Sequence, residues 1–296
     1  MQIFYLGNDY GQEVTEYIED GLRLNELRME MHEKDNPFLS SNLTIPIEEI
    51  EKENEFLTYL KKNDLLEEDN PFVTSKFLIA ITEMLSGVFL FIIILLICSD
   101  MLVYENEHQT VMRSLPVSFR TKATSKITLN YIFIILCLTL GVVLGIFRSS
   151  SVESIGNFNY PTLIFSPDGF IAVPIMEYVL YASLAVIVAV LMTVCLTLLL
   201  NTFVPNMYGV VLVGIALFFL PDLLYLIGIK AKILYPIKYI DISGVLSGEL
   251  AEQFNDTGIT YWNSIFAMLG FTVVLIVFIF VYNWLRFRKK RNNTDK

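Results

Sequence analysis

The sequence predicts an all-α, polytopic helical membrane protein that carries an acidic, mainly helical domain at its N-terminus. Three observations support this fold class. Of the 296 residues, 54% are hydrophobic, and the mean hydropathy of +0.55 exceeds that of a soluble domain with as many charges. The formal net charge is −10, yet residues 1–75 alone hold 18 Asp and Glu against 6 Lys and Arg. The rest of the chain is nearly neutral and contains long apolar runs.

The apolar runs include five that are long enough to span a bilayer, because a core about 30 Å thick needs roughly 20 helical residues. Pro221 and Asp222 interrupt the fourth run, so we expect a kink or a short re-entrant piece there and still count it as a span. The transmembrane domain then covers residues 76–291, with spans at 77–98, 127–147, 175–200, 207–229 and 262–285.

Basic residues near the ends of the spans predict the orientation, because short loops rich in Lys and Arg remain in the cytoplasm. The tail at 286–296 begins with the sequence RFRKKR and places the C-terminus inside. Counting back through five spans places residues 104–126 inside and the N-terminal domain outside. One loop contradicts this count, since it falls outside and carries Lys230, Lys232 and Lys238. High Ile, Lys and Asn contents indicate a bacterial cell membrane.

The acidic N-terminal domain, residues 1–75, shows apolar residues at three- and four-residue intervals over 13–34 and 45–68, which predicts two amphipathic helices. Each helix precedes a DNPF turn, at Asp35–Ser41 and Asp69–Ser75. These turns fit either a duplicated helix-turn unit or the repeated use of one helix-ending signal. A cluster of Lys and Arg that would bind nucleic acid is missing from this domain.

Motifs for several kinds of catalysis are absent from the sequence. It contains no phosphate-binding GxxxxGK[ST] loop and no GxSxG nucleophile motif, and its only histidines, His32 and His108, are far apart. The three cysteines lie in apolar runs, at Cys98, Cys137 and Cys195. We therefore expect no cofactor and no metal bound by this chain. A membrane enzyme that uses acids in or near the spans remains an alternative, with candidates at Glu83, Asp100 and Glu177.

The segment YENEHQTVMRSLPVSFRTKATSK, residues 104–126, separates the first two spans. Its apolar residues recur at helical spacing from Met101 to Leu115, which predicts a helix over 101–118 that lies along the membrane. Pro116 removes a backbone donor and ends this helix, and Ser118 is placed to start the next one. Acids suit an anionic lipid surface poorly, so a basic protein partner is the better match for Glu105 and Glu107.

This segment resembles the signature of ABC-2 type transporter permeases, the membrane subunits of ATP-driven exporters. It departs from the family pattern at Gln109, where the family usually has Gly, and at Phe119, which is inserted before the Arg. The residues that fit the pattern are Glu105, Glu107, Thr110, Leu115, Pro116, Ser118, Arg120 and Lys126.

The resemblance implies an exporter built from two membrane subunits, as a homodimer or heterodimer, and two ATPase subunits. ATP and Mg would bind in the ATPase, so this chain itself would not be an enzyme. The layout matches the family except for its first span. An upstream span missing from this frame would explain that difference, and so would insertion of residues 77–98 as a reverse anchor for the outer domain.

Within this scheme each residue of the segment has an expected role. Arg120 and Lys126 would anchor the segment to lipid or to the neighbouring helix. The contact with the ATPase would be made by the elbow helix through Glu105, Glu107, Thr110, Arg113, Leu115 and Pro116.

Two features outside this segment also have expected roles. Glu83, inside the first predicted span, is either a residue of the transport pathway or an acid that reaches the headgroups. Residues 241–256 suggest a short amphipathic helix on the outer face.

The exported substrate would be a peptide, a drug or a lipid. The rival function is that of a membrane immunity or sensor protein, which binds an extracellular peptide through the acidic domain without transporting it.

Overall fold

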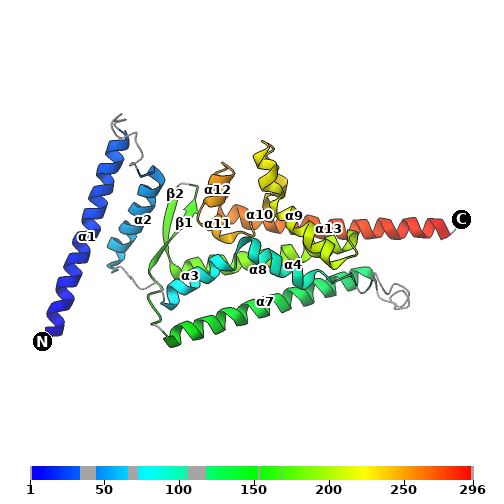
Figure 1. Cartoon of the computed structure of the whole chain (residues 1–296), viewed down its shortest axis with the longest axis horizontal. Coiled ribbons are helices and arrows are strands. Elements are labelled where there is room, and N and C mark those ends of the chain that lie inside the picture. The colour runs from blue at the N-terminus through cyan, green and yellow to red at the C-terminus, as the bar shows by residue number, and fades with distance from the viewer. Residues whose placement is uncertain are drawn as a thin grey trace.

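The computed structural model describes residues 2–33, 45–65, 73–103, 105, 118–152, 154–167 and 169–294. Long helices run side by side in an elongated bundle (Figure 1). The N-terminal helices stand at one end of this bundle, and the C-terminus lies at the other. The bundle is formed by α3 (Thr74–Met84), α4 (Gly87–Cys98), α7 (Phe119–Val152), α8 (Ile175–Phe203), α9 (Met207–Leu226) and α13 (Tyr261–Thr294).

The bundle has the properties of a helical membrane protein. Four of its described helices are long and apolar enough to cross a membrane, and the bent pair α3 and α4 together makes a fifth candidate. Helix α8 is central, because 67% of its apolar window is buried and it packs against α3, α4, α7, α9 and α13. Only 6% of the corresponding window of α7 is buried. Helix α7 therefore lies at the edge, with most of its apolar surface uncovered.

The first predicted span is broken rather than continuous. Helices α3 and α4 meet at an angle of 65°, and Gly87 at the break has a φ of +62°, which a residue with a side chain rarely adopts. The Gly87 N–H donates to the Ile240 carbonyl at 3.0 Å. Ser86 Oγ donates to Asp241 Oδ1 at 3.1 Å and accepts the Ser243 N–H at 2.9 Å. A loop from far along the chain thus satisfies the polar groups that the break exposes.

Two other spans differ from expectation in detail. Helix α7 has 34 residues and is about 51 Å long, well beyond the predicted 127–147. It begins where Ser118 predicts, because Ser118 Oγ accepts the Thr121 N–H at 3.2 Å. Helix α9 continues through the buried Pro221 to Leu226, so the expected re-entrant piece is not found there.

The N-terminal domain contains the two predicted helices, α1 (Gln2–Glu33) and α2 (Ile47–Asn63). The first DNPF turn lies outside the described residues, and the second is described only from Val73 onward. The small core of the domain includes Tyr160 and Ile175, at the entry to α8. The acidic domain is therefore packed directly onto the end of the bundle.

An antiparallel hairpin corrects the expectation of an all-α fold. Strands β1 (Pro161–Ser166) and β2 (Gly169–Pro174) pair from Pro161↔Pro174 to Ser166↔Gly169 and pack on α2. The Lys52 ammonium of α2 lies 4.4 Å from the centroid of the Phe170 ring. The sequence signal was present, since two apolar runs flank the turn-forming letters SPDG.

The region between α9 and α13 holds short helices rather than the single helix expected over 241–256. Gly248 separates two of them with a φ of +82°, and a Cβ there would lie 2.8 Å from the Phe165 ring. A residue with a side chain would collide with the hairpin at this point. The short helices are η1 (Lys232–Leu234), α10 (Tyr235–Lys238), α11 (Ile242–Leu246) and α12 (Glu249–Gln253).

Close contact between α9 and α4 gives a test of the packing. A Cβ on Gly214 would lie 2.6 Å from Leu95 Cδ1, whereas Gly270 on α13 has nothing within 4 Å of that position. We expect Gly214→Ala to lower the free energy of unfolding in detergent by about 1–3 kcal/mol through overpacking. Gly270→Ala should leave it unchanged or raise it by up to about 1 kcal/mol. Equal effects of the two substitutions would contradict this packing.

Candidate functional site

The candidate site lies where the chain leaves α4 and returns to α7. Glu105 Oε1 and Lys126 Nζ form an ion pair at 2.9 Å, with side chains 20% and 27% exposed. Lys126 Nζ also donates to the carbonyl oxygen of Met101. This ammonium therefore fastens the chain after α4 to the first turns of α7, and both ends of the intervening segment lie at the same end of the bundle.

Buried groups hold the chain after α4 from the other side. Asn201, near the end of α8, donates from Nδ2 to the Cys98 carbonyl at 3.2 Å and to the Thr197 carbonyl at 3.0 Å. Met101 and Leu102 are buried in the core of the bundle. The beginning of the predicted apolar stripe is thus packed against the protein, and its backbone is fixed by side chains of α7 and α8.

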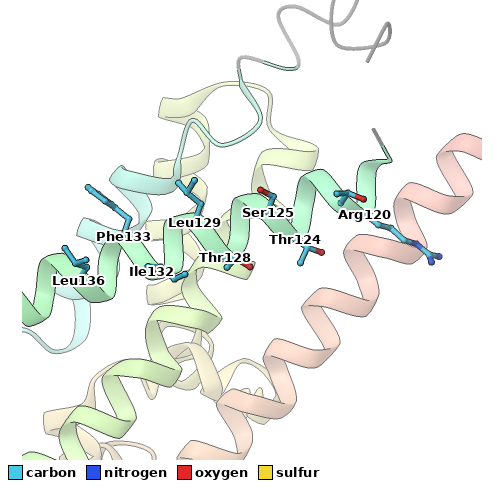
Figure 2. A pocket seen from close by; sticks show the side chains of 9 residues that line it. Arg120, Thr124, Ser125, Thr128, Leu129, Ile132, Phe133 and Leu136 are labelled. Atoms are coloured by element: carbon cyan, nitrogen blue, oxygen red, sulfur yellow. The ribbon is translucent and has the colours of Figure 1, made fainter. Parts of the chain in front are cut away.

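Arg120 lies on a different side of α7 from this junction. Figure 2 shows its side chain extending toward α13, while the hydroxyl-bearing residues Thr124, Ser125 and Thr128 follow it along α7. Arg120 makes no ion pair with any residue that the structure describes. The structure therefore separates the two predicted anchors, since Lys126 faces the protein and Arg120 faces a surface groove.

The remaining predicted contact residues cannot be placed. They fall in the stretch 106–117, outside the described residues, and are Glu107, Thr110, Arg113, Leu115 and Pro116.

The acids considered for a membrane enzyme are not brought together. Glu83 is exposed at the end of α3, and Asp100 lies beyond the 12 residues of α4, about 18 Å of helix. Glu177 accepts a hydrogen bond from the Tyr181 hydroxyl at 2.7 Å. Among the described residues there is also no group of three His, Cys, Asp or Glu able to hold a metal ion.

A second polar site, which sequence reasoning missed, lies at the far end of α9. Lys238 Nζ is 2.8 Å from Asp222 Oδ2, and the lysine side chain is only 8% exposed. Gln253 donates to the other carboxylate oxygen at 3.3 Å, and the Phe218 ring centroid lies 4.4 Å from the ammonium. The sequence did contain a signal for this site, because Asp222 is an acid beside a proline within an apolar run. In the structure this acid neutralises Lys238, a lysine from the following loop.

The same loop holds a more exposed ion pair. Lys232 Nζ lies 2.6 Å from Asp256 Oδ2, and this hydrogen bond holds the pKa of Asp256 below its ordinary value. Two of the three lysines that argue against an outer location are therefore matched by acids in the folded protein.

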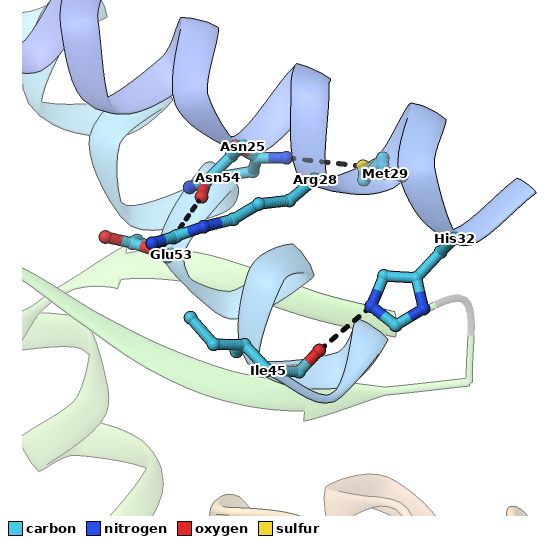
Figure 3. A network of polar contacts seen from close by, with 7 residues as sticks. All are labelled: Asn25, Arg28, Met29, His32, Ile45, Glu53 and Asn54. Carbon is cyan, nitrogen blue, oxygen red and sulfur yellow. Dashed lines mark hydrogen bonds and ion pairs between the residues drawn. The ribbon is translucent and has the colours of Figure 1, made fainter. Parts of the chain in front are cut away.

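Polar contacts in the N-terminal domain join α1 to α2, as Figure 3 shows. Arg28 Nη1 donates to Asn25 Oδ1 at 2.9 Å and lies 3.3 Å from Glu53 Oε2. His32 Nε2 lies 3.0 Å from the Ile45 carbonyl oxygen, which accepts a hydrogen bond. These groups fasten one helix to the other, and the network has the character of domain packing rather than of a catalytic centre.

No protein-family model, curated protein or solved structure matches the chain.

The ion pair at the junction can be measured by a double-mutant cycle with Glu105→Gln and Lys126→Met. Because both side chains are largely buried, we expect a coupling free energy of about 1–2 kcal/mol. The exposed pair Lys61–Glu19, at 2.9 Å, is the matched control and should give about 0–0.5 kcal/mol. Indistinguishable coupling energies for the two pairs would argue against a structural role for the junction.

The buried pair on α9 predicts an asymmetric response to mutation. Lys238→Met leaves Asp222 without its cation and should destabilise the protein by about 3 kcal/mol, measured by thermal unfolding in detergent. Adding Asp222→Asn to that variant should recover most of the loss, since no unpaired charge then remains. Lys230→Met, at an exposed position in the same loop, should change stability by less than about 0.5 kcal/mol. A double variant as unstable as Lys238→Met alone would contradict this account.

Proposed function

We propose that this chain is the membrane subunit of an ATP-driven exporter of the ABC-2 type. The junction of Glu105 with Lys126 is the observation that carries the proposal. It ties together the two ends of the segment that resembles the family's elbow, between an apolar helix that leaves the bundle and one that re-enters it. A segment held at both ends in this way is suited to receive a partner and to pass its movement to α4 and α7.

The geometry changes the role that we assign to Glu105. This carboxylate is already paired with Lys126 inside the protein, so it positions the segment rather than contacting an ATPase. Glu107 is the other acid of the family-like pattern, and we assign the contact with a basic surface of the ATPase to it.

A second membrane subunit and surrounding lipid suit the uncovered surface of α7. Several apolar side chains in the C-terminal half of this helix are more than half exposed, including Leu144 at 61% and Phe147 at 74%. In a membrane such side chains contact either lipid or another helix. The protein alone therefore leaves room for the dimer that an exporter of this class requires.

The proposed orientation has the acidic domain outside and the C-terminus in the cytoplasm of a bacterial cell. The two lie at opposite ends of the bundle (Figure 1), as this orientation needs. Glu83 lies one residue from the end of α3, next to the bend, and is exposed. That location suits an acid that a substrate passes on its way out, and we retain it as a pathway residue. The substrate class remains a peptide, a drug or a lipid.

Co-purification tests the proposal directly. The full-length chain, tagged and extracted from its host membrane in mild detergent, should bring down an ATP-binding cassette ATPase whose hydrolysis of ATP is measurable. Glu107→Lys should reduce the recovered ATPase about tenfold or more, because it sets like charges against each other. Glu48→Lys makes the same change at an exposed site on α2 and should have no effect.

The results of this experiment distinguish a wrongly assigned contact residue from a wrong function. Intact binding by Glu107→Lys would show that the contact is assigned to the wrong residue. If the folded chain recovers no such ATPase, the exporter function is wrong, and the rival immunity or sensor function gains support.

A further inference from the structure

A groove runs along the first turns of α7 and, among the described residues, is lined by side chains of this helix alone (Figure 2). Its volume is about 960 Å³. At the start of the helix it is lined by the guanidinium-bearing Arg120 and by the hydroxyl groups of Thr121, Thr124 and Thr128. This end therefore offers one cation and several hydrogen-bond donors.

The other end of the groove is apolar. Leu129, Ile132, Phe133 and Leu136 continue the same face of α7, and all four side chains are more than half exposed. The order of chemistry along the helix is thus a cation, then hydroxyl groups, then hydrocarbon. A membrane lipid presents the complementary order in one leaflet.

Helix α13 contributes to the polar end. Arg120 also lines a second hollow of about 290 Å³, together with Phe280, Asn283 and Trp284 of α13. An amide and an indole at this level are typical of the interface between headgroups and hydrocarbon. The exposed Arg120 thus has side chains of α13 on one side and the groove of α7 on the other.

The length of the groove matches one leaflet. From Arg120 to Leu136 the helix advances 16 residues, or about 24 Å at 1.5 Å per residue. Half of a bilayer, headgroups included, is about 20–22 Å thick. A lipid whose phosphate lies at Arg120 would place its acyl chain beside Leu129 to Leu136.

We propose that this groove binds one anionic phospholipid. Its phosphate accepts hydrogen bonds from Arg120 and from the neighbouring hydroxyl groups, and one acyl chain lies along the apolar end. The inference does not depend on the exporter function.

Charge favours a lipid over a second copy of the chain as the occupant. Helix α7 carries Arg120 and Lys122 at this end, and α13 continues into the basic sequence RFRKKR. A second copy docked here through α7 or α13 would bring basic residues against Arg120, whereas an anionic headgroup neutralises it.

The two tryptophans of the chain allow a direct test, because Trp284 lines the polar end and Trp262 lies at the other end of α13. The Trp262→Phe variant, reconstituted in vesicles, reports from Trp284 alone. Quenching by phosphatidylglycerol brominated near its headgroup should indicate binding about fivefold tighter than for equally brominated phosphatidylcholine. Adding Arg120→Gln should abolish that preference.

Two controls make the result specific. Arg148→Gln neutralises an exposed arginine at the opposite end of α7 and should leave the preference at Trp284 unchanged. In a Trp284→Phe variant, the quenching of Trp262 should be insensitive to Arg120→Gln. The proposal is overturned if Trp284 shows no preference for phosphatidylglycerol, if Arg120→Gln retains it, or if Arg148→Gln removes it equally.

Discussion

Hydrocarbon offers no hydrogen bonds, so polar groups within the bundle must find their partners in the protein. The partners come from distant parts of the chain: Ser86 contacts Asp241, Asp222 holds Lys238, and Asn201 donates to the end of α4. Apolar helices can slide past one another at little cost, but these contacts exist in one register only. They fix where the first span bends, how the loop between α9 and α13 folds back and where the chain leaves α4.

This constraint also explains how far the sequence could predict the structure. Helices α8, α9 and α13 follow from hydropathy and length, which are local properties of each segment. The bend before α4 is different, because it depends on Gly87 in a left-handed conformation and on hydrogen bonds to residues 240–243. Residues 77–98 contain Gly87, but they do not reveal the distant partners that stabilise the bend. The hairpin at 161–174 had a local signal, yet its strands are short apolar runs that periodicity alone assigns poorly.

The same distinction applies to the candidate site. Hydropathy placed residues 104–126 between two apolar helices, and Ser118 predicted the start of α7. The family-like pattern gave Glu105 and Glu107 a common role, because spacing along a chain says nothing of which carboxylate meets a cation. The ion pair of Glu105 with Lys126, which lies 21 residues on in sequence, depends on how α4 and α7 pack. Only the folded bundle shows that Glu105 holds the segment in place.

Helix α7 takes part in both the proposed exporter function and the proposed lipid site, because its basic residues lie on different sides of the helix. Lys126 is held by Glu105 within the protein, while Arg120 faces the groove beside α13. Since little of its apolar window is buried, α7 depends on contacts near its ends more than α8 does. If a partner moves the segment before α7, the helix must move with it, and the phosphate bound at Arg120 would then resist or follow that motion. An exporter built in this way would therefore couple less efficiently in a membrane without anionic lipid, although its ATPase would still bind.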